Sequence, residues 1–251
     1  MNYVVFDIET GPLDLPLLKE ILPGWDASTM PHPGDFDLRS VKTGNLKDQA
    51  KIDAKIAEAR DAHIERLNNY KFDVLRAEKN YWSEASSKAA LSAATGRVVA
   101  IGCKTESKLS ITAIDDNTTE RQMLHYFWQL YEQLRKSDRN LVGFNSNEFD
   151  VPFLAQRSVV LGVPVPRTLI KQGRYLDEMF IDLRKVWSFG AKPVGSLDMV
   201  CRACGIPGKP EGVNGAMFAE LYFNEETRDE AIGYLANDLE MKFALAERLI
   251  G

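Results

Sequence analysis

Four carboxylates in three short motifs are the side chains of this chain best suited to chemistry. Asp7 and Glu9 stand two residues apart near the start, Asp150 lies mid-chain, and Asp238 follows Tyr234 by four residues. Acids that fold into one place repel each other, and burial disfavours their charged forms further, so such a site needs cations. Two divalent metal ions held by acids are typical of enzymes that cleave phosphodiester bonds.

The first acid pair follows a predicted strand. Residues 3–8 are mainly β-branched and aromatic up to the first acid, which indicates a buried strand. Side chains two apart on a strand leave on the same face, so Asp7 and Glu9 are expected to point together. The dipeptide Gly11-Pro12 predicts that the chain turns directly afterwards.

The other acids lie at a predicted strand end and on a predicted helix. A strand at 140–144 leads to Asp150, and strand ends are the usual places for site residues in α/β sheets. A helix at about 226–249 carries Tyr234 and Asp238 on one face, because residues four apart are neighbours on a helix. The spacing therefore permits all four acids to reach one pocket.

The remaining pattern predicts an α/β fold with a mixed sheet flanked by helices. Two paired strands are expected at 97–104 and 109–114. Thr119 and Gln122 resemble a capping box that starts an amphipathic helix. Further predicted segments are a loop at 22–40, a helix after Asp150, a less regular stretch beyond it, and a helix at 196–204.

A long helical insertion follows the first strand. Residues about 46–92 contain no glycine or proline, and apolar side chains recur there at three- and four-residue steps. This pattern predicts one extended helix or a helical hairpin. One interpretation is a solvated arm that packs on the domain through its apolar stripe. The other is an arm that binds a partner or a second copy of the chain, or a flap over the substrate channel.

Composition limits the class of protein. The length of 251 residues and 45% hydrophobic content suit one large domain, or one domain with an insertion. The formal net charge of -5 argues against a broad, non-specific coat on nucleic acid. The sequence has no apolar run of about 18 residues, so we expect no membrane span. Three cysteines and no signal-peptide pattern predict a cytoplasmic location.

The three motifs, taken together, resemble those of the DEDD-superfamily 3′–5′ exonucleases, which have a ribonuclease H-like fold. Tyr234 matches the tyrosine (DEDDy) subgroup. Several segments are also similar to the proofreading exonuclease domain of family B DNA polymerases, namely Gly96–Gly102, Gly143–Leu154, Ser196–Asp198 and Gly208-Lys209. The resemblance covers residues 1–12 and about 96–251. We therefore predict a single exonuclease domain over 1–251, including a helical insertion at about 40–95.

The expected chemistry assigns each acid a place around two ions. Asp7 bridges both metals, Glu9 and Asp238 complete one, and Asp150 holds the other, partly through water. Carboxylate and water ligands suit Mg²⁺ or Mn²⁺. Tyr234 is expected to position the attacking water, because an ordinary tyrosine pKa of about 10 makes it a poor base at neutral pH.

The resemblance also implies the substrate and its contacts. Asn145 and Phe149 would hold the 3′ end, Phe149 by stacking on a base, and the Thr10 amide would reach the terminal 3′-hydroxyl. The expected activity is hydrolysis of single-stranded DNA, or of DNA 3′ ends, to nucleoside 5′-monophosphates, with a polymerase or another replication or repair protein as partner. The alternatives are a ribonuclease D-like RNA exonuclease and a catalytically weak nucleic-acid-binding or scaffolding protein.

Overall fold

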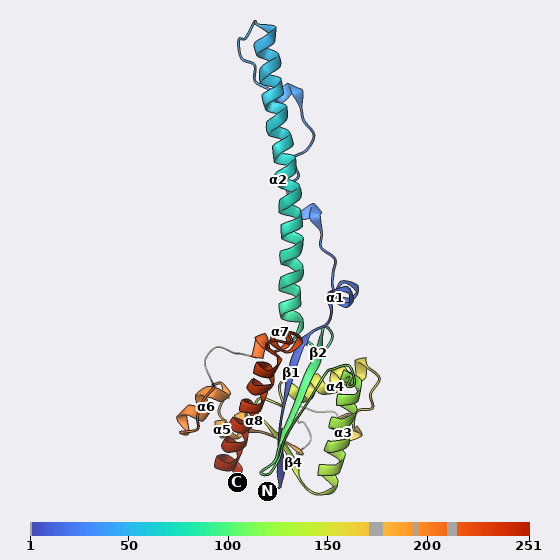
Figure 1. The fold of residues 1–251 in the computed structure, drawn as a ribbon, viewed down its shortest axis with the longest axis vertical. Coiled ribbons are helices and arrows are strands. Elements are labelled where there is room, and N and C mark those ends of the chain that lie inside the picture. The colour runs from blue at the N-terminus through green and yellow to red at the C-terminus, as the bar shows by residue number, and fades with distance from the viewer. Residues whose placement is uncertain (1, 171–177, 193–194, 210–214) are drawn as a thin grey trace. The chain divides into compact units, whose positions relative to one another are not determined.

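A five-stranded mixed sheet has the predicted first strand at its centre (Figure 1). The computed structural model describes residues 2–170, 178–192, 195–209 and 215–251. The strand order is β3-β2-β1-β4-β5, in which β1 is antiparallel to β2 and parallel to β4. The strands are β1 Tyr3–Pro12, β2 Gly96–Lys104, β3 Leu109–Ala113, β4 Asn140–Gly143 and β5 Phe180–Asp182.

Strand β1 is longer than predicted, and the turn expected at Gly11-Pro12 is wrong. Both residues continue the pairing with β2, after a bulge between Glu9 and Thr10. Proline is tolerated here because the pairing with β4 covers Tyr3–Val5 and does not reach Pro12, which therefore lies on an edge stretch of β1. A Cβ built on Gly11 would lie 2.6 Å from the Cβ of Ala219, so this glycine serves close packing rather than a turn.

Helices cover both faces of the sheet, as predicted (Figure 1). One face carries α3 Glu120–Lys136 and α4 Asp150–Val160. The other carries α5 Leu183–Ser188, α6 Leu197–Ala203, α7 Phe218–Phe223 and α8 Arg228–Ile250. Side chains of β1 alternate between these two cores, with Val4 and Phe6 toward α3 and with Tyr3 and Val5 toward α8.

The alternation decides which helices meet the first acids. Asp7 and Glu9 continue the set that begins with Tyr3 and Val5, so they leave β1 on the α8 face. Gly102 pairs with Asp7, and a Cβ built on it would lie 2.5 Å from Cδ1 of Leu239. The missing side chain therefore allows α8 to pack closely on the sheet opposite the first acid.

A buried ion pair fixes α4 against α3 and β2. The Arg157 guanidinium donates to both carboxylate oxygens of Glu120, at 2.8 and 2.7 Å, and to the carbonyl of Ala93 at 3.0 Å. Glu120 also accepts the Val98 amide at 2.8 Å. The predicted capping box at the start of α3 is confirmed, since Thr119 and Gln122 cap each other's backbone.

In the described ranges, three short α-helices and one strand were not predicted from the sequence. The strand β5 has three residues, which is too short for an alternating pattern to show, and it lies with α5 in the stretch expected to be less regular. The other two are α1 Leu15–Ile21, in the second unit, and α7, each at most seven residues long. The helices expected at 196–204 and 226–249 are confirmed as α6 and α8.

Residues Leu15–Ser86 form a second compact unit, separate from the unit of Met1–Asp14 and Ser87–Gly251. Its main element is the part of α2, Gln49–Ala89, that runs up to Ser86. The helix α2 is one extended helix of 41 residues and not a hairpin. The segment 22–40 is irregular, as predicted, and contains 3₁₀ turns at Ala27–Thr29 and Leu38–Ser40. Its rings contact the apolar stripe of α2 in antiparallel order, as the pairs Trp25–Tyr81, His32–Tyr70 and Phe36–His63.

These contacts within the second unit explain why α2 carries an apolar stripe. The centroids of the His32 and Tyr70 rings are 4.7 Å apart, and the Tyr81 hydroxyl donates to the Pro23 carbonyl at 2.7 Å. The stripe thus packs on the preceding segment of its own unit. None of the helices in the described ranges is both long and apolar enough to cross a bilayer.

Candidate active site

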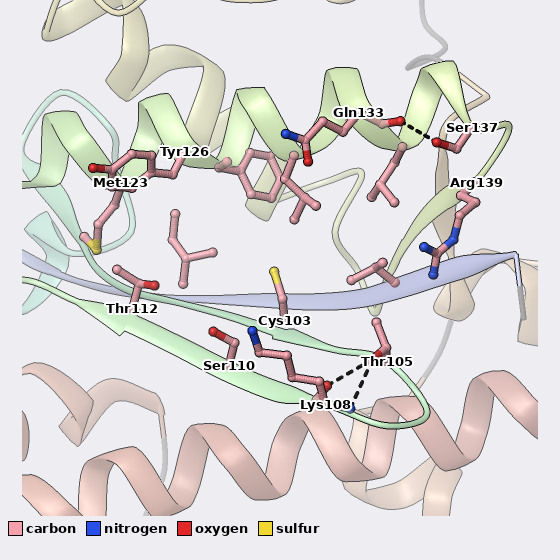
Figure 2. Close-up of a pocket in the computed structure, with 15 residues that line it drawn as sticks. Cys103, Thr105, Lys108, Ser110, Thr112, Met123, Tyr126, Gln133, Ser137 and Arg139 are labelled. Carbon is pink, nitrogen blue, oxygen red and sulfur yellow. Dashed lines mark hydrogen bonds between the residues drawn. The ribbon is translucent and has the colours of Figure 1, made fainter.

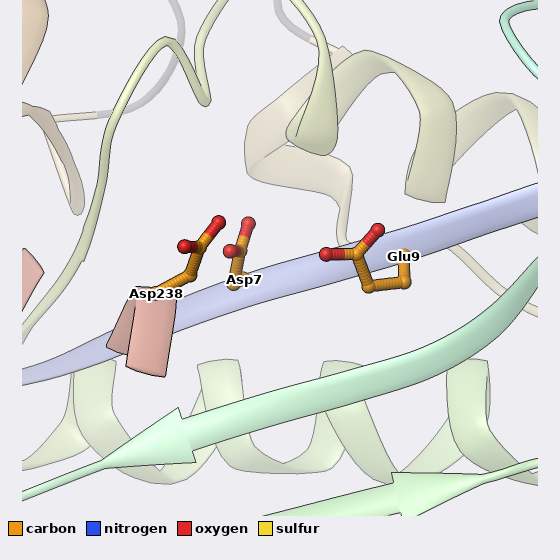
Figure 3. A group of neighbouring side chains, drawn as sticks. All are labelled: Asp7, Glu9 and Asp238. Carbon is orange, nitrogen blue, oxygen red and sulfur yellow. The ribbon is translucent and has the colours of Figure 1, made fainter. Parts of the chain in front are cut away.

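Three of the four predicted acids meet where β1 faces α8 (Figure 3). Asp7 and Glu9 from β1 and Asp238 from α8 each offer a carboxylate oxygen, and these oxygens all lie within 4.8 Å of one another. All three side chains are buried. The two-residue strand spacing and the helix face predicted from the sequence produce this arrangement.

Asp150 lies against Asp7 but outside that three-acid group. It is the first residue of α4 and is buried. Burial raises its pKa most, the charge of Lys242 opposes this, and Asp7 raises it again by charge and hydrogen bonding, so that the pKa is about 7. Asp7 is therefore the acid that joins Asp150 to Glu9 and Asp238.

Burial also disfavours the charged forms of Glu9 and Asp238. Burial raises the pKa of Glu9 well above its ordinary value, and the charges of Asp7 and Asp238 raise it further. Burial, then Asp7, likewise raises the pKa of Asp238. One oxygen of Asp238, Oδ1, is buried and has no hydrogen-bond partner among the residues that the structure describes. An unpartnered, buried carboxylate oxygen beside two more acids fits a cation ligand.

Two lysines that the sequence analysis gave no role lie among these acids. Lys242 is buried, stands four residues after Asp238, and forms an ion pair with Asp7. Lys209 donates from Nζ to the Tyr234 hydroxyl at 2.5 Å and to Asp238 Oδ2 at 2.6 Å. The spacing of Tyr234, Asp238 and Lys242 on one helix face was a signal that could have found the first lysine.

Tyr234 is held as a protonated hydroxyl. The pKa of Tyr234 is raised, mainly by burial. The hydrogen bond from the Lys209 ammonium lowers this pKa, and the charge of Asp238 raises it further. Its oxygen accepts the hydrogen bond from Lys209, so its own proton is available to another acceptor. This arrangement favours positioning over base chemistry.

The residues expected to hold substrate lie toward the end of β1 and in the segment after β4, and these two strands are neighbours in the sheet. Thr10 is half-buried and follows the β1 bulge. Asn145 has left-handed backbone with φ of 61°, and its side-chain oxygen accepts from Arg184 Nη1 at 2.9 Å. The half-buried Phe149 ring packs on Phe153, with 5.5 Å between centroids. The structure thus engages Asn145 and Phe149 in contacts within the protein.

Asp182 is a further residue that the sequence analysis missed. It ends β5, is buried, and accepts the amides of Asn145 and Asn147 at 2.8 and 3.2 Å. It also caps α5 by accepting the amide of Arg184 at 3.0 Å. Its carboxylate holds the loop that precedes Asp150. The available signal was an acid directly after a short apolar run and before a helix.

A hollow of about 460 Å³, with polar and apolar lining residues, lies between α3 and strands β2 and β3 (Figure 2). Val4, Cys103 and Phe127 are among its lining residues. Val4 belongs to the face of β1 opposite Asp7 and Glu9, so this hollow is separate from the acids.

Residues 90–240 match the family described as predicted 3′–5′ exonucleases related to the exonuclease domain of PolB. The chain belongs to this exonuclease family. The matched residues include Asp150, Tyr234 and Asp238, whereas Asp7 and Glu9 precede them. In the structure, these two acids lie beside Asp238 of the matched region.

Among solved structures, this exonuclease-family chain is similar to the family B DNA polymerase of the hyperthermophilic archaeon Pyrobaculum calidifontis. The TM-score is 0.52 and the sequence identity 21% over 65% of this chain. The match covers 23% of the polymerase chain, so this chain shares the fold of one part of that enzyme. No curated protein sequence matches the chain.

Proposed function

We propose that this protein is a metal-dependent 3′–5′ exonuclease of the tyrosine subgroup that hydrolyses single-stranded DNA, or DNA 3′ ends, to nucleoside 5′-monophosphates. The observation that carries the proposal is the buried group of Asp7, Glu9 and Asp238, with Asp150 joined to it through Asp7. Four buried acids on a fold shared with polymerase exonucleases support phosphodiester hydrolysis.

The acids provide two cation positions, one on each side of Asp7. The first cation position is formed by Asp7, Glu9 and Asp238, and the unpartnered Oδ1 of Asp238 supports it. The second is formed by Asp7 and Asp150. Bound Mg²⁺ or Mn²⁺ would supply an activated water and stabilise the charges that develop on the attacking and leaving oxygens.

The protein's own residues orient the reactants. The Lys209 ammonium fixes the Tyr234 hydroxyl, which then directs its proton toward the attacking water. We assign Thr10, Asn145 and Phe149 to the 3′ end, with the bulged backbone at Thr10 beside the acids and Phe149 stacking on a base. Phe149 is half-buried, so part of its ring remains available for that contact.

The choice of DNA is supported by the likeness to a family B DNA polymerase, as is the proposal that a polymerase or another replication or repair protein is the partner. A 5′-labelled oligonucleotide tests the reaction, in DNA and RNA versions of one sequence, with Mg²⁺, Mn²⁺ or a chelator. We expect a ladder that shortens from the 3′ end, faster on DNA, and no ladder with chelator.

Circular single-stranded DNA is the matched control, because it has no 3′ end and should stay intact. Faster cleavage of the RNA version would mean that RNA, rather than DNA, is the preferred substrate. Binding of both oligonucleotides without cleavage under either metal would favour the nucleic-acid-binding alternative and contradict the proposed activity.

A further inference from the structure

Lys242 is a lysine buried beside the candidate metal ligands. Its residue is 4% exposed, and it lies one helical turn after Asp238 on α8. Lysine is seldom this buried unless its charge is paired. Its Nζ forms an ion pair with Asp7 Oδ1, the same oxygen that accepts the Ile8 amide at 3.1 Å.

The surroundings keep this lysine charged. Burial alone would lower the pKa of Lys242, but the nearby carboxylates of Asp7, Asp150 and Asp238 outweigh burial and raise the pKa above its ordinary value. The effect is mutual, since Lys242 lowers the pKa of Asp150. A charged ammonium therefore lies against Asp7 and within electrostatic reach of Asp150.

The two cation positions consequently differ. The first, formed by Asp7, Glu9 and Asp238, still has the unpartnered oxygen of Asp238. The second, formed by Asp7 and Asp150, has the ammonium of Lys242 in contact with Asp7 and in electrostatic reach of Asp150. A cation that enters the second position must compete with an ammonium that belongs to the protein.

The charges of the site agree with this difference. Within the described part of the site, four carboxylates and the ammoniums of Lys209 and Lys242 leave two formal negative charges when all groups are ionised. One divalent ion would neutralise them. A second divalent ion would leave excess positive charge, unless a nucleic-acid phosphate also enters.

We propose that Lys242 is a built-in cation that occupies the second cation position in the nucleic-acid-free protein, so that only the first position binds a free divalent ion tightly. This inference rests on the metal dependence proposed above and deepens it. A second ion would bind only by displacing the Lys242 ammonium.

Binding of Mn²⁺ without nucleic acid tests this proposal, by calorimetry and by loss of the free-ion EPR signal. The wild-type protein should bind one Mn²⁺ tightly, with any further ion about tenfold weaker or more, as expected for a competing fixed charge. Lys242→Met, which is an unbranched side chain one atom shorter and removes the charge, should bind two ions with closer affinities.

Lys104→Met is the matched control. Lys104 is also buried and ion-paired, but its partners are Glu240 at 3.0 Å and the Phe243 ring. This variant should retain one tight Mn²⁺. Circular dichroism checks that both variants are folded.

Asp150→Asn provides a second test that does not depend on folding of the Lys242 variant. It should keep the single tight Mn²⁺, because Asp150 faces the ammonium rather than the first position. Two equal ions in the wild-type protein, one ion in folded Lys242→Met, or loss of tight Mn²⁺ in Asp150→Asn would each overturn the inference. Absence of Mn²⁺ binding in every protein would instead contradict the proposed metal dependence.

Discussion

At the scale of single residues, Asp7 connects the two parts of the site. It lies within the three-acid group, contacts Asp150, and forms the ion pair with Lys242. Its position two residues before Glu9 on a strand, and opposite Gly102, places its carboxylate beneath α8. Loss of this one side chain should therefore affect both cation positions.

Tyr234→Phe should reduce kcat by roughly ten- to a hundredfold, because misplacement of a reacting group costs on the order of a hundredfold. Mn²⁺ binding should stay at the wild-type level, since the tyrosine is not among the acids that form the cation positions. Single-turnover cleavage and calorimetry measure the two properties. Full activity in the variant would remove Tyr234 from the mechanism.

The metal-free protein should become less stable as the pH rises from about 5.5 to about 7.5. The folded pKa of Asp150, about 7, lies above its ordinary value of 3.8. Between these values the folded state binds a proton that the unfolded state has lost, so folding is favoured at the lower pH. Glu9 and Asp238 act in the same direction.

Thermal denaturation in chelator at both pH values measures this effect. Asp150→Asn should flatten the dependence on pH, whereas Asp115→Asn, at an exposed acid whose pKa is lowered, should preserve it. A wild-type Tm that rises with pH across this window would contradict the described burial of the acids.

Residue types and spacing were sufficient to identify the acids and Tyr234 as candidates. They did not identify Lys209, Lys242 or Asp182, because the roles of these residues depend on contacts between elements distant in sequence. Lys209 meets Tyr234 across 25 residues, and Asp182 meets Asn145 across 37. Local signals existed for Lys242, in the four-residue spacing along α8, and for Asp182, as an acid between a short apolar run and a helix.

At the scale of elements, β1, α4 and α8 must keep their relative positions to within less than the length of a side chain. The strand β1 is fixed by pairing on both edges, and α8 packs on it where Gly102 leaves space. The helix α4 starts with Asp150 and is anchored further along by Arg157. The Arg157–Glu120 pair therefore supports the position of the fourth acid.

Arg157→Met should lower the free energy of unfolding by about 3–5 kcal/mol, because it leaves Glu120 as a buried, unpaired charge. The side chains of this pair are 3% and 11% exposed. Chemical denaturation measures the loss. Cleavage should also fall, as Asp150 loses support.

Arg135→Met is its control, because the Arg135–Glu132 pair on α3 has side chains 45% and 39% exposed. Exposed pairs contribute at most about 1 kcal/mol. Equal losses in the two variants would contradict a supporting role for Arg157.

The principal elements of the sheet and the long helices could be predicted because their patterns are local. The five-residue stretch of alternation in β3, the capping box of α3 and the period of α8 all occur within single segments. The turn expected at Gly11-Pro12 failed because a tertiary contact with Ala219, invisible in the local pattern, explains the glycine. Short β5 depends on pairing with β4 and carries too few residues for a period.

At the scale of the whole molecule, the chain combines an exonuclease fold with a second unit whose role stays a proposal. The apolar stripe of α2 is covered by residues 22–40. On another face of α2, Ile64, Phe72 and Leu75 are 49%, 71% and 62% exposed. Their spacing of eight and three residues places them on one side of the helix, a surface suited to self-association.

The double variant Phe72→Glu with Leu75→Glu should therefore reduce the mass measured by light scattering toward the 28.2 kDa of one chain. The wild-type protein should show a larger mass at the same concentration. Ala62→Glu adds one charge at an exposed position two residues before Ile64, on the other side of the helix, and should leave the mass unchanged. A monomeric wild-type protein would contradict self-association through α2.

We propose that buried acids around Asp7 hold the metal for exonuclease chemistry, and Asp7→Asn tests this role most directly. Single-turnover shortening of 5′-labelled single-stranded DNA in Mg²⁺ should slow about a thousandfold or more, because a catalytic metal contributes several kcal/mol and about 1.4 kcal/mol is tenfold in rate. Asp14→Asn is the matched control, at an exposed acid paired with Arg97 at 2.8 Å beyond β1, and should cleave at the wild-type rate. Wild-type cleavage by folded Asp7→Asn would contradict the account.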